Sequence, residues 1–291
     1  GMLLDGQAEE AQLGAFLMLL RHKEESVEEL AGFVDAVRAR LATPPIKVDI
    51  DWPSYAGKKR HLPWFLLAAK ALANSGLRIL MHGGGMHTAG RLYSEQLLEL
   101  LDIPLCGDWA QVASALEQQH LAFIPLGAWM PELQRMIDLR NVLGLRSPIH
   151  SLARLLNPLQ ARCGLQSIFH PGYQSVHRDA SQLLGDRVIV VKGEGGEIEV
   201  NPDSPCQLFG TSAQGIWNEE WPALSAQRHV KPAQLDPAKL LAVWHGHDTD
   251  EYGLQAITGS IALALRGLGR TREEALEQAR QVWANRLTEA V

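Results

Sequence analysis

The sequence has few cysteines and no apolar run long enough to cross a membrane. Three cysteines occur in 291 residues, Cys106, Cys163 and Cys206, and none belongs to a CxxC pair. Their spacing argues against a zinc site or a disulfide framework, so buried thiols are expected. The longest apolar run, LPWFLLAAKALA, is interrupted by Lys70 and is shorter than a bilayer requires. Because the chain starts with the acidic stretch GMLLDGQAEE and shows no signal peptide, we expect a cytoplasmic protein without membrane contact.

Acidic residues are missing from one long window and nearly missing from another. Residues 52–94 contain six Lys or Arg and no acid, and residues 135–178 contain six Arg and one acid, Asp138. The two windows together carry +11, so the remainder carries −17 to give the net charge of −6. Charge segregated on this scale indicates an anion-binding surface on an acidic body. The alternative is that folding scatters these cations over different faces.

The pattern of apolar residues predicts helices first, then an α/β region, then helices. Apolar residues recur at helical spacing in the first forty residues, and the segment after Pro237 is also predicted to be helical. Between them, residues 46–50 and 77–81 are predicted strands on either side of a helix from about Leu62 to Asn74. Such a βαβ unit has parallel strands. The expected fold class is therefore α/β with a mostly parallel central sheet.

Two domains are expected from this order of elements. Residues 1–43 would form a small helical domain, joined by helices from about residues 90–118, and residues 44–291 would form the larger α/β domain. The predicted boundary coincides with Thr43-Pro44-Pro45, which interrupts the helical pattern.

The turn after the first predicted strand lacks the glycines typical of a phosphate-binding turn. It has a single glycine and the side chains Trp52, Pro53, Tyr55, Lys58, Lys59 and Arg60. The three consecutive cations favour contact with phosphate, and the aromatic rings favour stacking with bases.

Three further motifs are candidate sites for an anion or a metal ion. HGGGMHTAG offers His82 and His87 around the triplet Gly83, Gly84 and Gly85, although it could equally be a flexible loop. LRNVLGLRSPIHSLARLLNP offers arginines that could grip a carboxylate or phosphate, or could lie on a solvated helix face. KGEGGEIEVNPD offers carboxylates for Mg²⁺, which an ordinary exposed strand would also show.

Taken in order, these motifs resemble the anthranilate phosphoribosyltransferase family, which has the glycosyltransferase family 3 fold. MHGGGMHTAG lies where that family has KHGNR, LRNVLGLRSPIHSLARLLNP resembles its R-x-x-LG-x-RT-x-x-N…NP element, and VKGEGGEIEVNPD resembles its HGEGLDE turn. Arg140, Arg146, Asn157 and Pro158 match the family pattern. The resemblance covers nearly the whole chain and implies a nucleoside phosphorylase/phosphoribosyltransferase-like fold with a small N-terminal helical domain.

The chain departs from that family where substrate and metal would bind. The family's GTGGD loop, which holds the diphosphate of phosphoribosyl pyrophosphate, is replaced by DWPSY at residues 51–55. The Asp-Glu pair that holds magnesium becomes Glu197-Ile198, with Glu199 one place further on. These departures are similar to the YbiB-type subfamily, which is regarded as homodimeric and DNA-binding rather than biosynthetic.

Two functions of different classes are therefore expected, and the sequence leaves open whether the protein is an enzyme. The first is a sequence-nonspecific nucleic-acid-binding homodimer, for DNA and without a cofactor, that associates through its N-terminal helices. Its phosphate contacts would come from Lys58, Lys59, Arg60, Arg91, Arg140, Arg146 and Arg154, with His82 and Gly83 to Gly85.

The alternative is a phosphoribosyltransferase with an altered acceptor. In that case Gly83 to Gly85 would bind the phosphoribosyl donor, Glu197 and Glu199 would hold Mg²⁺, and Arg140 or Arg146 would bind an acidic acceptor. A purely structural or regulatory homologue is a third hypothesis.

Overall fold

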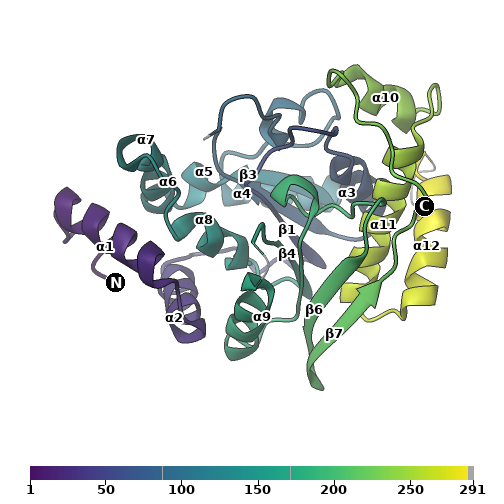
Figure 1. Ribbon diagram of the computed structural model, residues 1–291. Coiled ribbons are helices and arrows are strands. Elements are labelled where there is room, and N and C mark those ends of the chain that lie inside the picture. The colour runs from purple at the N-terminus through teal and green to yellow at the C-terminus, as the bar shows by residue number, and fades with distance from the viewer. Residues whose placement is uncertain (87, 171, 288–291) are drawn as a thin grey trace.

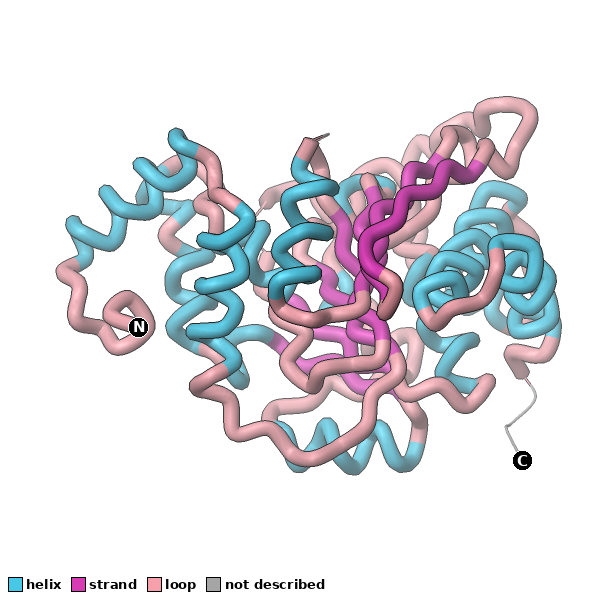
Figure 2. The backbone as a smooth tube through the Cα atoms, turned by 90° about the horizontal axis from the view of Figure 1, so that it is seen from below, coloured by secondary structure: helices cyan, strands magenta, loops and turns pink. Residues whose placement is uncertain are grey.

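The computed structural model describes residues 1–86, 88–170 and 172–287. It has three layers, with helices on both faces of one central sheet (Figures 1 and 2). The strands are β1 (Ile50–Ser54), β2 (Ile79–Gly83), β3 (Leu121–Pro125), β4 (Cys163–Ser167), β5 (Val188–Val191), β6 (Cys206–Ser212) and β7 (Gly215–Trp221).

The sheet is mostly parallel, as predicted. Its strand order is β3-β2-β1-β4-β5-β6-β7. The first five strands in this order are parallel neighbours, whereas β6 and β7 add to β5 as an antiparallel hairpin. The expected βαβ unit is confirmed, because Ile50 of β1 is paired with Ile79 of β2 in parallel register.

The first strand lies later in the chain than predicted. β1 extends from Ile50 to Ser54, so Trp52 and Pro53 belong to the strand and not to a turn. All five residues of this strand are buried. A central parallel strand is covered by helices on both faces, and the apolar Trp52 satisfies this requirement where a solvated turn residue would not.

Successive strand residues supply two separate cores. Ile79 and Met81 of β2 face one core, and Leu80 between them faces the other. This alternation follows from the two-residue repeat of a strand. The first core is covered by α3 (Phe65–Asn74), α10 (Ala238–Trp244), α11 (Glu251–Gly267) and α12 (Arg272–Ala284). The predicted helical tail is therefore confirmed, and it packs on one face of the sheet.

The second core is shared between the sheet and the N-terminal helices. Its helices are α1 (Glu10–Lys23), α2 (Val27–Arg38), α4 (Trp109–Gln118), α5 (Leu126–Trp129), α6 (Pro131–Asp138), α8 (Ile149–Leu152) and α9 (Tyr173–Leu183), and α7 (Arg140–Leu143) follows α6. α2 packs against α8 and α9, whereas α4 packs against β3. The domain boundary at residue 43 stays a prediction.

Two 3₁₀ turns lie between these elements. The segment 90–118, where helices were expected, contains a single 3₁₀ turn, η1 (Ser94–Gln96), before α4. A second 3₁₀ turn, η3 (Glu194–Gly196), follows β5, which pairs with the later strand β6. None of the described helices is both long and apolar enough to span a membrane.

Candidate ligand-binding site at the carboxyl edge of the sheet

The parallel strands bring the predicted motifs together at one edge of the sheet. β1 ends at Ser54, β2 at Gly83, β4 at Ser167 and β5 at Val191, and a motif follows each of these ends. Because the carboxyl ends of parallel strands share one edge, segments far apart in sequence become neighbours there. Two polar regions result, a closed network and an open cleft.

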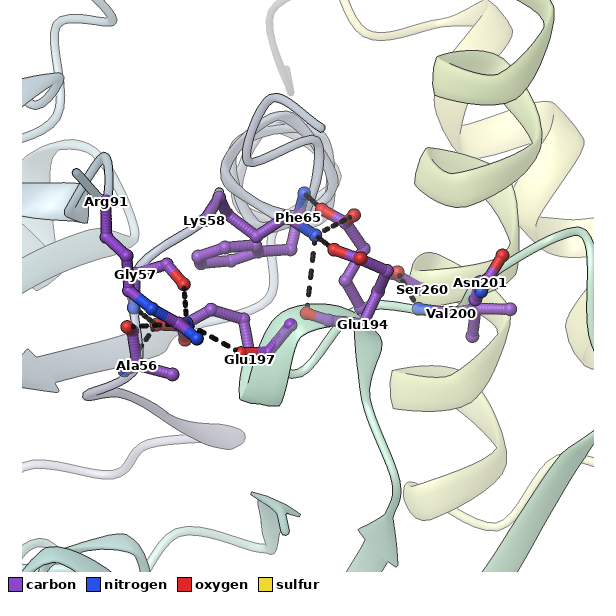
Figure 3. A network of polar contacts seen from close by, with 12 residues as sticks. Ala56, Gly57, Lys58, Phe65, Arg91, Glu194, Glu197, Val200, Asn201 and Ser260 are labelled. Atoms are coloured by element: carbon purple, nitrogen blue, oxygen red, sulfur yellow. Dashed lines mark hydrogen bonds and ion pairs between the residues drawn. The ribbon is translucent and has the colours of Figure 1, made fainter. Parts of the chain in front are cut away.

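The closed network is built around Lys58. Its ammonium group forms ion pairs with the carboxylates of Glu194 and Glu199, the latter at 2.6 Å, and its side chain is 0% exposed. The second oxygen of Glu199 accepts a hydrogen bond from the backbone N–H of Phe65 at 2.9 Å, at the start of α3 (Figure 3). Burial acts to lower the pKa of Lys58, but the charges of Glu199 and Glu194 outweigh it and raise that pKa.

Glu197 closes the other half of the network. Its Oε1 atom accepts hydrogen bonds from the backbone N–H groups of Ala56, at 2.7 Å, and Gly57, at 2.6 Å. Arg91 donates from Nη1 to the carbonyl oxygens of Ala56, Gly57 and Gly195 at 2.9–3.1 Å (Figure 3). The turn after β1 is thus held to the turn after β5 by groups of the chain itself.

The network removes several predicted contacts from the surface. Lys58 was expected to contact phosphate, but in this structure its ammonium is buried and pairs with Glu194 and Glu199, so it is not available to a phosphate. Trp52 and Tyr55, at 0% and 2% exposure, cannot stack on bases. Lys59 and Arg60 are exposed and stay available. Three consecutive cations therefore differ in exposure, because the first is buried and the other two lie on the surface.

The glycine-rich motif after β2 has a packing role. His82 is 0% exposed, with Nδ1 2.8 Å from the Tyr55 hydroxyl. A side chain at Gly83 would meet the carbonyl oxygen of Ser54 at 2.5 Å, so this glycine permits close strand packing. Gly84 is buried and Gly85 is partly exposed. His87 lies outside the described residues. In this structure His82 is turned inward and is not offered to a ligand.

The carboxylates predicted to hold Mg²⁺ do not fit that ion as they are placed. Glu197 is directed to backbone N–H groups, and Glu199 is paired with the Lys58 ammonium. Within residues 1–86, 88–170 and 172–287, no group of three His, Cys, Asp or Glu side chains is arranged to hold a metal ion.

The open cleft lies beside this network, between the N-terminal helices and the edge of the sheet. It contains a cavity of about 570 Å³. The walls come from the α1–α2 junction, the segment around α8, the end of β4 and the start of α9. Its polar lining residues are Arg21, Glu24, Glu25, Arg146, Ser147, His150, Ser151, Arg154, Ser167, His170, Tyr173 and His177.

Several arginines lie in or near this cleft. Burial lowers the pKa of the Arg146 guanidinium, and nearby positive charges lower it further. Those charges belong to Arg91, Arg154 and Arg140. Arg154 also donates from Nη1 to the carbonyl oxygens of Ser167 and Gly196, each at 2.6 Å, and links the cleft to the closed network. The predicted grouping of these arginines is thus present, although Arg91 and Arg154 bond mainly to the chain itself.

Several cleft residues were not anticipated from the sequence. Ser167 is the last residue of the buried strand β4, and His177 lies on α9. A detectable signal was the polar set Gln174, His177, Arg178 and Ser181, which recurs at helical spacing where an apolar face would be expected and is buried. A buried polar face of this kind requires partners, and the sequence alone did not identify them.

Comparison with known proteins finds similarity to a glycosyl transferase helical domain and to anthranilate phosphoribosyltransferases. Residues 1–41 match the family described as glycosyl transferase family, helical bundle domain. An uncharacterized protein named YbiB from Escherichia coli (strain K12) is 29% identical over 220 residues, which covers 74% of this chain and 68% of that protein. An anthranilate phosphoribosyltransferase from Anaeromyxobacter sp. (strain Fw109-5) is 31% identical over 199 residues, 66% of this chain and 58% of that protein.

Solved structures agree with this similarity at the level of the fold. The anthranilate phosphoribosyltransferase (TrpD) from Thermus thermophilus superposes with a TM-score of 0.81 at 23% identity, over 98% of this chain and 88% of that one. The enzyme from Saccharomyces cerevisiae in complex with PRPP and Mg gives a TM-score of 0.74 at 17% identity, over 95% of this chain and 81% of that one. The chain spans less than two thirds of the anthranilate phosphoribosyltransferases it matches in sequence. It is similar to them in sequence and has their fold.

Proposed function

We propose that this chain is an anthranilate phosphoribosyltransferase-like protein that has lost the transferase site and binds nucleic acid without sequence preference. The closed network is the observation that supports the loss of the transferase site. In the resembling enzymes, the turn after the first strand holds a diphosphate and a carboxylate pair holds magnesium. Here Glu197 takes the amides of Ala56 and Gly57, and Lys58 supplies the positive charge between Glu194 and Glu199.

An ammonium group in place of a metal ion has a chemical consequence. Lys58 neutralises the buried carboxylates but offers no open coordination position, so it cannot bridge the oxygens of a diphosphate. The Glu197 carboxylate would also repel a diphosphate from the amides it occupies. Phosphoribosyl transfer requires that the diphosphate is held in position and that its charge is stabilised. The turn after β1 and the carboxylates after β5 are less suited to these two tasks here than the corresponding groups of the enzymes.

The proposed nucleic-acid binding is supported by the cations that are exposed to solvent. Lys59 and Arg60 are exposed beside the network, and Arg140 and Arg146 are partly exposed near the cleft. Guanidinium and ammonium groups suit the repeated phosphates of a nucleic acid. No bound cofactor is required for such contacts.

Homodimerisation is part of the proposal and is supported by apolar side chains around α1 and α7. Leu19 is 68% exposed, Val142 81% and Leu145 52%, although all three are large and apolar. Such a patch on a helical surface favours a protein partner. A second copy of the chain, associated through its N-terminal helices, is the partner we propose.

The test is a salt titration of DNA binding. Labelled duplexes of two unrelated sequences should bind with similar affinity, and the logarithm of the affinity should fall with the logarithm of salt by about 0.9 per phosphate contacted. The double variant Lys59→Ala/Arg60→Ala should flatten that slope by up to about 1.8. The matched control is Arg270→Ala/Arg280→Ala, which removes two exposed cations from the C-terminal helical region.

Three outcomes would contradict the proposal. No complex at about 50 mM salt would remove nucleic acid as the partner. Equal slopes for both double variants would remove Lys59 and Arg60 from the contact surface. Turnover of anthranilate and phosphoribosyl pyrophosphate at about 1 s⁻¹ would restore the alternative, a transferase that uses the open cleft for its acceptor.

A further inference from the structure

The open cleft contains buried polar atoms that the chain leaves without partners. Ser147 is 4% exposed, Ser167 1% and His177 0%, and all three residues line the 570 Å³ cavity. Within the described residues, the Oγ atoms of both serines and Nε2 of His177 have no hydrogen-bond partner. Buried polar atoms are nearly always paired in folded proteins, so three of them around one cavity indicate a polar occupant.

The hydrogen-bond network defines what His177 requires of that occupant. Gln166 donates from Nε2 to the Ser181 hydroxyl at 3.0 Å, so its Oε1 is the acceptor that faces Nδ1 of His177 at 3.2 Å. Nδ1 therefore carries the proton by assignment, and Nε2 is an acceptor. Burial, followed by the charge of Arg154, lowers the pKa of His177 to about 3, so the ring is neutral at pH 7. The occupant must supply an N–H or O–H donor.

The charges around the cavity differ from one side to the other. Arg146 and Arg154 provide guanidinium groups on the α8 side. Glu24 and Glu25 provide carboxyl groups at the α1–α2 junction. Arg21 lines the cavity on the same side, but its guanidinium donates to the carbonyl oxygen of Arg146. Guanidinium groups bind phosphate well, and carboxylates accept hydrogen bonds from amines and hydroxyls. A molecule with an anionic group at one end and hydrogen-bond donors at the other fits this distribution.

An aromatic side chain is available at the same cavity. Phe169 follows β4, lines the cavity and is 55% exposed. A large apolar ring left exposed beside arginines is typical of sites that stack planar bases. The cavity volume also lies within the range of about 300–1,000 Å³ that is common for small-molecule sites.

We propose that this cavity binds one nucleotide unit, with its phosphate toward Arg146 and Arg154 and its base against Phe169. The donors of the base or ribose would pair with the buried acceptors of Ser167 and His177. Two sources share this chemistry, a free nucleoside monophosphate and an unpaired nucleotide of a bound strand. Only the second source rests on the proposed nucleic-acid binding.

The first arm of the test uses small molecules and the full chain. Calorimetric titration with adenosine 5′-monophosphate and cytidine 5′-monophosphate should show saturable binding. Adenosine, ribose 5-phosphate and inorganic phosphate should each bind at least about tenfold more weakly, because each lacks at least one of the contacts made by the phosphate, the base and their hydrogen-bond donors. Ser167→Ala and His177→Leu should each weaken nucleotide binding by about tenfold. His247→Leu, an exposed histidine outside the cavity, is the matched control and should bind like the parent.

The second arm uses a 12-nucleotide oligothymidine with one central 2-aminopurine. If the cavity takes a nucleotide from a strand, 2-aminopurine fluorescence should rise on binding as the base leaves its stack. Ser167→Ala should abolish the rise while overall affinity changes less than about twofold, because the substitution leaves the cations that contact the phosphates unchanged. Phe169→Ala changes an exposed position and should also reduce the rise in fluorescence. It replaces the cavity variants Ser167→Ala and His177→Leu if these do not fold.

The outcomes separate this inference from the proposed function. Nucleotide binding without any DNA complex would support the cavity and remove the nucleic-acid function. DNA binding with neither nucleotide binding nor a fluorescence change would overturn the cavity assignment and leave the proposed function intact. Ribose 5-phosphate binding as tightly as the nucleotides would overturn the assignment of a base.

Discussion

The closed network around Lys58 and the open cleft beside Arg154 lie at the same edge of the sheet, yet they satisfy their polar groups in different ways. In the network, carboxylates, an ammonium group and backbone amides pair with one another. In the cleft, the Oγ atom of Ser167 and Nε2 of His177 have no hydrogen-bond partner within the described residues. In the network, one carboxylate oxygen, Glu197 Oε2, also has no hydrogen-bond partner among the described residues, but Glu197 does not line the cavity of the cleft. Groups that pair mainly with one another stabilise a fold, whereas unpaired polar atoms that line a cavity require a partner from outside the chain.

Arg154 shows how closely the two regions are connected. Its Nη1 atom donates to Gly196 of the network and to Ser167 of the cleft, each at 2.6 Å. The closed network and the open cleft therefore share a structural support. Changes confined to the network should alter stability most, and changes confined to the cleft should alter ligand binding and pH response.

The largest expected effect comes from breaking the network at its centre. Lys58→Met leaves the carboxylates of Glu194 and Glu199 buried without their cation. Removing one partner of a buried ion pair typically costs about 3–5 kcal/mol in the free energy of unfolding. Urea denaturation at pH 7 measures this loss. Lys59→Met, at the exposed neighbouring cation, is the matched control and should change stability by less than about 0.5 kcal/mol. Equal stability of the two variants would contradict a closed network.

A second change should turn part of the network into an open site. Glu197→Ala removes the acceptor of two buried N–H groups, those of Ala56 and Gly57, and should destabilise the protein by about 2–3 kcal/mol. Because two amides beside Arg91 then lack an acceptor, inorganic phosphate should raise the melting temperature of this variant and not that of the parent. Glu197→Gln retains an acceptor oxygen and should respond like the parent. A phosphate response shared by all three proteins would show that Glu197 does not occupy an anion site.

The third prediction concerns the cleft and the pH dependence of stability. The pKa of His177 is about 3 in the folded protein and about 6.5 in the unfolded chain, so only the unfolded chain takes up a proton between these values. The contribution of this ring to the free energy of unfolding therefore does not change with pH well above pH 6.5. It decreases as the pH falls below 6.5, because protonation stabilises the unfolded chain only. Between pH 7 and pH 5 the loss should be about 2 kcal/mol. His177→Asn should remove this part of the pH dependence, and His247→Asn should not. Parallel curves for the parent and both variants would contradict a buried neutral ring.

The sequence predicted the parallel sheet because its strands are short, apolar and separated by a helix, and those features are local. It could not distinguish Lys58 from Lys59 and Arg60, because the carboxylates that bury Lys58 lie 136 and 141 residues away in the chain. The arginines near the cleft were found as a charge pattern, but their orientation depends on carbonyl groups of η3 and β4 that only the tertiary fold supplies. Ser167 and His177 were missed because a lone serine or histidine carries no pattern of its own.

The smallest expected effect lies in the backbone of the cleft. Glu24, at the α1–α2 junction, has φ 64° and ψ 148°, a region that side chains other than glycine rarely adopt. In the network, the residues with positive φ are glycines, since Gly195 and Gly196 have φ 70° and 92°. Glu24→Gly relieves this strain in the folded protein, but glycine also gives the unfolded chain more conformational freedom. The net effect should be a stabilisation of about 1 kcal/mol. Glu24→Ala removes the same carboxylate without relieving the strain, so it is the control for lost charge. Urea denaturation of both variants separates the two contributions. If glycine and alanine give equal stability, the junction is not strained. If glycine stabilises the chain but weakens nucleotide binding more than alanine does, then the strained conformation of Glu24 contributes to the shape of the cleft.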